Sequence, residues 1–493
     1  MGNEGVLSGL GLVIAGEVVP GAGEPYPVRN PARPTEQVFL APSASSAQLD
    51  RAVAVARAAA PAWAARGFDD RAAVVMAAAQ AGVARVERDD LARVLTREHG
   101  KVLWEATFDA GTMGAMAESF TPRAAEALGG RSYRGGATRV EWVPHGVVAA
   151  ILPFNWPVSV MANKVLPALL TGNTVVVKAP PTCPGAVLLI AAAMAEVLPA
   201  GVLNVLNGPG PELGEALVGH SDIDMVSFTG GVPTGQAVMA SAAATTRPVV
   251  LELGGNDAAI LAPDIEVDHD LAGRLVDAAF VTSGQVCMAI KRLYVHRSRF
   301  DATVAALVDR LSHDVVGDGL ADGVTMGPVH LAASKERVES FLAEAEQGGA
   351  KVHRPGRIRD EDAETGGYFV SPALVESPAP AARIVREEQF APALPVLAYD
   401  DIDDAVDAAN DTTFGLCASV WSNDAVLASS VAPRLAAGTV FVNTHGISAI
   451  DPDAPMGGWK QSGLGLELGP EGMQAYTRAR VVITQGAPNG SGA

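Results

Sequence analysis

The sequence predicts an α/β fold organised around a parallel β-sheet with helices on both faces. Between residues 147 and 253, short apolar or β-branched runs alternate with helical stretches, and the runs are Val147–Leu152, Thr174–Val177, Val202–Leu206, Met225–Phe228 and Val249–Leu251. Continuous apolar strands separated by helices are typical of a doubly wound parallel sheet. The chain has 493 residues, more than one ordinary hydrophobic core holds, so two or three domains are expected.

Helices precede this alternating region, and a second α/β region follows it. Residues 46–66 and 70–98 are rich in alanine and carry apolar residues at helical spacing, which predicts two long helices. From residue 257 onward we expect a second α/β domain, with strands at Lys291–His296 and Gly438–Asn443. The charged, glycine-containing stretch Arg357–Gly367 predicts a surface loop.

The composition disfavours several classes of partner and location. A net charge of −19 argues against binding to nucleic acid or to an anionic membrane, and no run of about 18 apolar residues marks a membrane span. The segment Met1–Val6 lacks the basic start of a signal peptide, and three cysteines indicate a reducing compartment. We therefore expect a cytoplasmic protein, whose tail Gln485–Ala493 is frayed.

Two glycine-rich turns are candidates for holding a phosphate. The turn that starts at Gly208 follows a strand and opens a helix, but its last gap is one residue longer than in the dinucleotide fingerprint. The turn that runs from Phe228 through Thr229, Gly230 and Gly231 to Gly235 is a better candidate, because free N–H groups at a helix start face an anion. A plain tight turn between strand and helix is the alternative reading of both.

Two polar side chains are expected at the ends of strands, where ligands of such sheets bind. Lys178 ends one strand and is a candidate for bonding ribose hydroxyls; a solvated lysine is the alternative. Asn155 lies in the string Leu152–Pro157, among prolines and aromatic residues. A rigid amide there suits an oxyanion hole, although an asparagine that bonds its own backbone is equally compatible with a turn.

Cys287 and Glu252 are the candidate nucleophile and base. Cys287 closes the string Phe280–Cys287, thirty-five residues after Glu252 in the string Glu252-Leu253-Gly254-Gly255. A thiol needs a lowered pKa or a partner base to react, and a partly desolvated carboxylate is a suitable base. The alternatives are an inert buried cysteine and a structural, salt-bridged glutamate. Cys183 and Cys417 lack such a setting.

Taken together, these strings resemble those of the NAD(P)-dependent aldehyde dehydrogenase superfamily over nearly the whole chain. The strings Glu387–Pro392 and Pro455–Gly463 add to the likeness, and all the motifs occur in the family's order and spacing. The resemblance implies an aldehyde dehydrogenase-like fold in three parts. These are a Rossmann-like parallel-sheet cofactor domain (1–125 and 145–254), an α/β catalytic domain (255–470), and a small β oligomerisation extension with the tail (126–144 and 471–493).

The resemblance also implies the chemistry. The Cys287 thiolate attacks the aldehyde carbonyl, and the Asn155 amide and the Cys287 backbone N–H hold the oxyanion. After hydride transfer leaves a thioester, Glu252 activates the water that hydrolyses it, and Glu467 matches a family glutamate that assists the water or proton step. A CoA-acylating relative is the alternative, disfavoured because that reaction needs no base such as Glu252. A non-enzymatic protein on the same fold is a third alternative.

For the cofactor, the resemblance implies NAD and no metal. Lys178 and Glu388 would bond the riboses, Phe390 would pack near the nicotinamide, and Gly230 would let the pyrophosphate approach. Pro181 stands where many NAD-preferring members have glutamate, so NADP is not excluded. The remaining expected contacts are Pro153, Phe154, Trp156, Gly208, Phe228, Thr229, Gly231, Gly235, Leu253 and Gly254.

The substrate and assembly follow from the same likeness. The family's aldehyde tunnel corresponds to a mostly apolar set of positions, Trp156, Val160, Asn163, Val286, Met288, Ile450 and Met456. With no arginine beside Cys287 in the sequence, an apolar aliphatic or aromatic aldehyde is favoured over a semialdehyde. The segment Arg131–Pro144 and the strand near Ala479–Thr484 would pair between subunits, which implies a homodimer or homotetramer.

Overall fold

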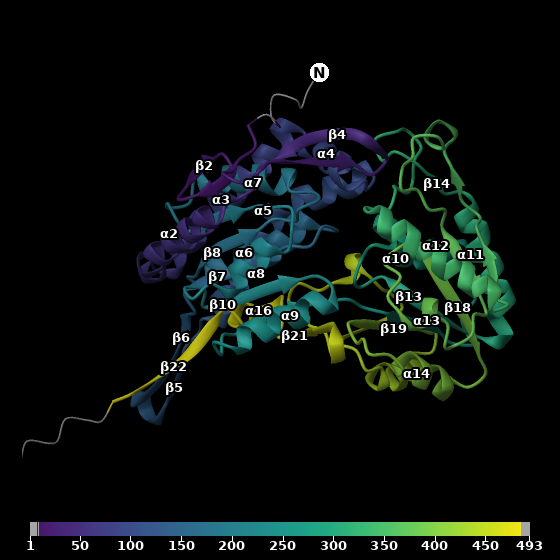
Figure 1. The fold of residues 1–493 in the computed structure, drawn as a ribbon. Coiled ribbons are helices and arrows are strands. Elements are labelled where there is room, and N and C mark those ends of the chain that lie inside the picture. Colours follow the sequence, from purple (N-terminus) through teal and green to yellow (C-terminus); the bar gives the residue numbers. More distant parts are fainter. Residues whose placement is uncertain (1–6, 8, 485–493) are drawn as a thin grey trace, which may run out of the picture.

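The computed structural model describes residues 7 and 9–484 of the chain. Two large β-sheets of eight and seven strands form its framework, and their helices cover both faces of each sheet (Figure 1). The N-terminal segment Met1–Val6 and the tail Gln485–Ala493, for which we made predictions above, lie outside the described residues. None of the described helices combines the length and apolarity that crossing a membrane requires.

The first sheet has the order β2-β1-β9-β8-β7-β10-β11-β21, and its five central strands are parallel. Its strands are β1 (Leu12–Ile14), β2 (Glu17–Val19), β7 (Val147–Ile151), β8 (Thr174–Lys178), β9 (Leu203–Leu206), β10 (Met225–Thr229), β11 (Val249–Glu252) and β21 (Gly463–Leu464). The five expected strands are therefore confirmed. The antiparallel strand β1, which lies between β2 and β9 and pairs with β9 through Val13 and Val205, was not predicted from the sequence.

Helices bury this sheet on both sides. Val148 and Ala150 of β7 belong to one core cluster, and Val147, Ala149 and Ile151 belong to another on the opposite face. The helices are α2 (Ser46–Ala65), α3 (Phe68–Asp89), α4 (Leu91–His99), α5 (Leu103–Ala127), α6 (Pro157–Leu170), α7 (Gly185–Ala195), α8 (Glu212–Gly219), α9 (Val232–Ala243) and α16 (Gly469–Gln474). Strands buried on both faces explain the continuous apolar runs.

The second sheet has the order β15-β17-β18-β13-β12-β19-β20 and is parallel except for β15. Its strands are β12 (Asp257–Leu261), β13 (Ile290–His296), β15 (Lys351–His353), β17 (Ala373–Glu376), β18 (Ala393–Tyr399), β19 (Cys417–Trp421) and β20 (Thr439–Val442). Its helices are α10 (His269–Phe280), α11 (Phe300–Ser312), α12 (Ala332–Gln347), α13 (Arg383–Arg386), α14 (Ile402–Asn410) and α15 (Ala425–Val431). The prediction of a second α/β region is confirmed.

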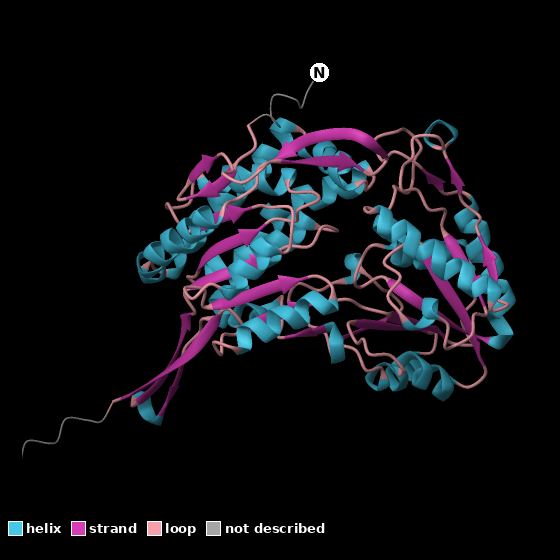
Figure 2. Ribbon diagram, viewed as in Figure 1, coloured by secondary structure: helices cyan, strands magenta, loops and turns pink. Residues whose placement is uncertain are grey.

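Three smaller sheets complete the fold. A three-stranded sheet of β5 (Arg131–Tyr133), β6 (Thr138–Pro144) and β22 (Thr477–Ile483) projects away from the rest of the molecule (Figure 2). Within the chain, β6 pairs with β22 along its whole length; pairing between subunits stays a prediction, as do the domain boundaries. The other two sheets are β3 (Tyr26–Asn30) with β4 (Arg33–Ala41), and β14 (Val315–Val316) with β16 (Arg357–Ile358).

Two local predictions were wrong in detail. The single helix expected over residues 70–98 is two helices, because Asp90 adopts a left-handed conformation with φ of 49° between them; aspartate tolerates that conformation better than most residues. The expected loop Arg357–Gly367 contains β16 and a fully buried Asp362, which accepts a hydrogen bond from the Asp318 N–H at 3.0 Å. The segment is therefore tied to the second α/β region rather than free in solvent.

Candidate active site

A cavity of about 460 Å³ lies at the carboxyl ends of the parallel strands of the first sheet. Its walls come from the segments that follow β7, β8, β10 and β11, from α12, and from the loop that carries Glu388 and Phe390. The predicted cofactor residues that line it are Pro153, Phe154, Pro181, Phe228, Thr229, Gly230, Gly231, Leu253, Gly254, Glu388 and Phe390. Asn155 and Cys287 line it too, so the structure gathers these residues at one place.

Four predicted cofactor residues are not in the wall of this cavity. Trp156 lines a second cavity instead. A Cβ added to Gly235 would lie 2.4 Å from a Leu253 methyl carbon, so this glycine lets α9 pack against Leu253. Gly208 packs near the Leu213 side chain, 3.2 Å from the place of a Cβ. Lys178 is the last residue of β8, two residues before Pro180 of the wall.

Several groups of the cavity are suited to a cofactor that would occupy it. Thr229 Oγ1 is buried and has no hydrogen-bond partner among the described residues, and a Cβ on Gly254 would meet Glu388 Oε2 at 2.4 Å. The Lys178 ammonium makes no hydrogen bond or ion pair within the described chain, and burial lowers its pKa to about 8. Unpartnered buried donors and acceptors are costly, so a ligand with hydroxyl groups would supply the missing partners.

The Asn155 turn rests on a buried ion pair. Asn155 Nδ2 donates to the Gln285 carbonyl at 3.0 Å, so the amide faces the segment of Cys287. Behind it, Lys101 Nζ donates to the Asn155 carbonyl at 2.7 Å and to Asp109 Oδ2 at 2.9 Å. The sequence did not predict Lys101 or Asp109, because buried partners of this kind follow no periodic pattern.

His330 is a second residue that sequence reasoning missed. Its ring stacks on Phe154 with centroids 4.6 Å apart, and its Nε2 lies 2.6 Å from Thr182 Oγ1 in the cavity wall. Burial lowers the pKa of His330 to about 4, so the ring is neutral near pH 7. It serves as a packed support for the aromatic wall.

Cys287 follows a left-handed turn at residues 282–284. Thr282, Ser283 and Gly284 have φ of 53°, 55° and 69°. The Thr282 N–H donates to the Glu105 carboxylate of α5, and Ser283 Oγ donates to the Gly327 carbonyl at 2.8 Å. Contacts from several elements therefore hold a turn that is unfavourable for residues other than glycine.

The electrostatic setting of the thiol is mixed. Burial raises the pKa of Cys287 well above its ordinary value, and the carboxylates of Glu252, Glu388 and Asp257 raise it further. The Lys291 ammonium acts in the opposite direction. These effects together favour the protonated thiol of Cys287. Ionisation of this thiol therefore requires a base or a neighbouring cation.

Two glutamates lie close together near the thiol. Glu252 ends β11, and its buried Oε1 has no hydrogen-bond partner within residues 7 and 9–484. Burial together with the Glu467 charge raises the pKa of Glu252. Glu467 accepts a hydrogen bond from Lys164 Nζ at 2.7 Å, and Lys164 reaches Ser227 Oγ at 3.1 Å. A carboxylate with a raised pKa and a free oxygen is suited to take a proton from water.

The second cavity, of about 590 Å³, adjoins the residues on either side of Cys287. Of the expected tunnel positions, Trp156, Val286 and Met288 line it, whereas Val160, Asn163, Ile450 and Met456 do not. Trp104 and Phe108 of α5, which the sequence did not single out, line its mouth with exposures of 60% and 55%.

Two arginines also line this second cavity, and both have partners. Arg310 pairs with Asp314 at 3.3 Å and with Asp277 at 3.8 Å. Arg274 donates to the Asn443 carbonyl and lies 5.1 Å from the ring centroid of Trp421. Neither guanidinium is left without a partner in the described structure.

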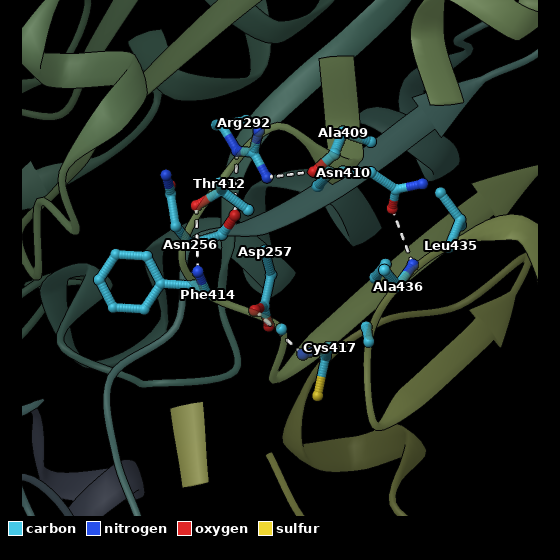
Figure 3. Close-up of a pocket in the computed structure, with 14 residues that line it drawn as sticks. Asn256, Asp257, Arg292, Ala409, Asn410, Thr412, Phe414, Cys417, Leu435 and Ala436 are labelled. Carbon is cyan, nitrogen blue, oxygen red and sulfur yellow. Dashed lines mark hydrogen bonds between the residues drawn. The ribbon is translucent and has the colours of Figure 1, made fainter. Parts of the chain in front are cut away.

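A third, small cavity lies beside Cys417 (Figure 3). The buried Arg292 donates there to the carbonyls of Asn256 and Ala409 at 3.0 and 2.8 Å, and Asp257 accepts the Cys417 N–H at 3.1 Å. Its volume of about 10 Å³ leaves room for one water molecule at most. Cys417 and Cys183 are both buried, so neither is an accessible nucleophile.

Comparison with known proteins shows which family has a sequence similar to this chain. A family model described as the aldehyde dehydrogenase family matches residues 18–482. The chain is 36% identical to 3,6-anhydro-alpha-L-galactose dehydrogenase of Streptomyces coelicolor over 468 residues, covering 94% of this chain and 93% of the relative.

Solved structures agree. The fold matches an E. coli NADP dependent enzyme with a TM-score of 0.90 at 32% identity, covering 98% of this chain and 99% of the other. It matches a mutant of aldehyde dehydrogenase C from Pseudomonas syringae, complexed with NAD+ and octanal, with a TM-score of 0.87 at 35% identity, covering 96% of each chain. The predicted resemblance and fold class are thus confirmed: the chain belongs to the aldehyde dehydrogenase family and is an NAD(P)-dependent oxidoreductase that acts on aldehydes.

Proposed function

We propose that the enzyme oxidises apolar aldehydes to carboxylic acids through a thioester on Cys287, which water then hydrolyses. The observation that carries this proposal is the position of the thiol. Cys287 lines the first cavity, while its neighbours Val286 and Met288 line the second. A nucleophile between the two cavities can bind an aldehyde from the second cavity. It can then present the C–H bond of that aldehyde to a cofactor in the first cavity.

In the first half of the reaction, the Cys287 thiolate adds to the carbonyl carbon and the carbonyl oxygen becomes an oxyanion. The Asn155 side-chain amide and the Cys287 N–H donate hydrogen bonds to that oxyanion. The C–H bond then breaks with its electron pair leaving as hydride, and the carbonyl re-forms as a thioester. The bound NAD(P)+ supplies the hydride acceptor.

In the second half, Glu252 takes a proton from water as the water oxygen attacks the thioester carbon. The C–S bond breaks, the carboxylic acid leaves, and the Cys287 thiolate is regenerated. We assign Glu467 to the release of the proton from Glu252, because it lies close enough to raise the Glu252 pKa and is itself bonded to Lys164.

For the cofactor, we assign ribose binding to Lys178 and Glu388, since the ammonium lacks a partner and the carboxylate lies in the cavity wall. Glu388 Oε1 is oriented by the Gly255 N–H at 3.0 Å. Pro181 brings no carboxylate to the wall, so we propose that both NAD and NADP are accepted. The match to an NADP dependent enzyme supports this assignment.

For the substrate, the aromatic lining of the second cavity favours an apolar aldehyde. The relative solved with octanal is consistent with that preference. A semialdehyde with a carboxylate end is the alternative, and the two arginines of the cavity are its possible ligands. Both are already bonded within the protein, which argues against it.

A CoA-acylating reaction is the second alternative for the fate of the thioester. The buried, unpartnered carboxylate oxygen of Glu252 favours hydrolysis, because transfer to CoA needs no water-activating base. Addition of CoA to the assay discriminates the two: we expect free acid as product at an unchanged rate. Acyl-CoA formation would show that the deacylating nucleophile is CoA.

The test of the proposed function is the Cys287→Ala variant. We expect it to bind NAD like the parent enzyme, measured by quenching of protein fluorescence, but to lose dehydrogenase activity about a thousandfold or more. The assay follows reduced nicotinamide with propanal, octanal and benzaldehyde, each with NAD or NADP at equal concentration. The matched control is Cys417→Ala, which we expect to keep activity; full activity in the Cys287 variant would overturn the mechanism.

The assembly expected from the sequence is also a proposal. We propose that the sheet of β5, β6 and β22 joins subunits in a homodimer or homotetramer, because its outer strands β5 and β22 each pair with β6 alone in the described chain. Strand edges without partners favour such pairing. The cytoplasmic location stays a prediction.

A further inference from the structure

Lys291 is a buried cation for which the proposed mechanism has no role. It is the second residue of β13 and is 1% exposed. Its Nζ donates to the Gly284 carbonyl at 2.6 Å and lies 5.4 Å from the ring centroid of Phe390. No ion pair joins it to a carboxylate in the part of the chain that the structure describes. A fully buried charge without an ion-pair partner is costly, so its position requires an explanation.

The carbonyl that Lys291 binds belongs to the left-handed turn before the nucleophile. Gly284 has φ of 69°, and a Cβ there would lie 2.4 Å from the Ala391 carbonyl oxygen. The turn is therefore pressed against the loop that carries Phe390. Lys291 sits at the junction of both segments, since its own carbonyl also accepts a hydrogen bond from Gln389 Nε2 at 3.4 Å.

The charges around the thiol are mainly negative. Three carboxylates from three segments raise the pKa of Cys287, namely Glu252 of β11, Asp257 of β12 and Glu388 of the cofactor loop, whereas Lys291 lowers it. The Lys291 charge also lowers the pKa of Glu388, which burial raises to about 7. His445 lies 3.6 Å from Asp257, and Arg292 donates to the carbonyls of Asn256 and Ala409.

We propose that Lys291 is a positioning residue of the reaction, which fixes the turn before Cys287 and supplies the positive charge that favours the Cys287 thiolate. The inference rests on the proposed role of Cys287 as the nucleophile. The same charge keeps the Glu388 carboxylate available for the cofactor ribose. One ammonium thus links the nucleophile to the loop that holds the cofactor.

The test is the pH profile of Cys287 alkylation by iodoacetamide in the full-length Lys291→Met variant, with the adduct located by mass spectrometry. We expect the midpoint to rise by about one pH unit or more, so that alkylation below the midpoint slows about tenfold. In this variant, kcat for propanal should fall by a larger factor than KM changes. Its NAD affinity should fall with decreasing pH at a midpoint above that of the parent, because the pKa of Glu388 is about 7 with Lys291 in place and loss of that charge raises it. Lys291→Arg, which keeps the charge, should restore a profile close to that of the parent.

The control is Lys335→Met, which removes another lysine that donates to a backbone carbonyl, that of Gly367 at 3.3 Å. We expect its alkylation profile to equal that of the parent. An unchanged profile in Lys291→Met would overturn the inference. If Lys291→Met does not fold, Lys291→Gln replaces it, because glutamine retains a hydrogen-bond donor without the charge. A raised midpoint of alkylation in Lys291→Gln would support the inference, and an unchanged midpoint would overturn it. If alkylation of Cys287 leaves the parent enzyme active, it is the proposed function that fails first.

Discussion

At the residue scale, the two glutamates near Cys287 have different surroundings, and this difference suits them to different steps of the reaction. Glu467 is bonded to the Lys164 ammonium, whereas Glu252 keeps a buried oxygen free. Burial and the neighbouring negative charge both disfavour the ionised form of Glu252, so its pKa is raised. The ionised fraction of Glu252 therefore increases as pH rises through that elevated pKa, and deacylation should accelerate in the same direction.

The Glu252→Gln variant tests this division. We expect acylation of Cys287 to continue while hydrolysis slows by a factor of about 100 to 10,000, the usual contribution of a general base. The thioester should then accumulate and appear in the mass spectrum as an acyl adduct on Cys287. Glu471→Gln, at an exposed position of α16, serves as the control. Normal turnover without any adduct would show that another group activates the water.

At the element scale, α5 supplies groups to both sides of the active site. Trp104 and Phe108, four residues apart, lie at the mouth of the second cavity, while Glu105 and Asp109, also four residues apart, are buried. Residues at this spacing share one face of a helix. Glu105 accepts a hydrogen bond from the Thr282 N–H of the turn before Cys287, and Asp109 accepts one from the Ser159 N–H of α6 at 2.8 Å. The position of this helix therefore couples substrate access to the nucleophile.

The aromatic pair on α5 gives a prediction about substrate length. Phe108 packs edge-on against Trp156 with centroids 5.9 Å apart, so an apolar chain leaving Cys287 can cover Phe108 and then Trp104. We expect Trp104→Ala to lower kcat/KM for octanal about tenfold and to leave propanal within about twofold, because each buried methylene contributes about 0.8 kcal/mol. The measurement is kcat/KM across aldehydes of increasing length.

The control for this prediction is Val426→Ala, which removes an exposed apolar side chain on α15. Its chain-length profile should match that of the parent enzyme. Equal losses for propanal and octanal in Trp104→Ala would show that Trp104 supports the fold rather than the substrate.

At the scale of the whole molecule, the projecting sheet of β5, β6 and β22 exposes apolar side chains on an outer strand. Val481 and Ile483 of β22 are 56% and 70% exposed, although both are apolar and lie on an outer strand. We expect the double substitution Val481→Asp and Ile483→Asp to shift the molar mass in solution toward that of a monomer, measured by light scattering after size exclusion. Charges on a strand edge oppose pairing with another edge.

Val426→Asp, which places a charge on a remote exposed site, should leave the oligomer intact. A parent enzyme that is already monomeric, or a variant whose mass is unchanged, would contradict the proposed interface.

Much of the fold could be read from the sequence because its signals are local. The five central strands of the first sheet are continuous apolar runs, and burial on both faces of a parallel sheet demands that pattern. The glycines of the turn after β10 and the residues around Asn155, Glu252 and Cys287 likewise stand in short strings. Such strings predicted most of the residues that the structure gathers around one cavity, although Lys178, Trp156, Gly208 and Gly235 are not in its wall.

Only the tertiary structure decided how the buried charges are arranged. Lys101 reaches Asn155 from 54 residues away, Lys164 reaches Glu467 from 303, and Lys291 holds the turn that precedes the thiol. No periodicity marks these partners, because their stability depends on burial and on distances between segments that the fold brings together. The same holds for the break at Asp90, for the antiparallel strand β1, and for the two exposed aromatic residues at the mouth of the second cavity. The sequence alone determined the family and the residue types of the candidate site, because these are written in short local strings. The packing of distant segments decided the geometry of the site and its charges.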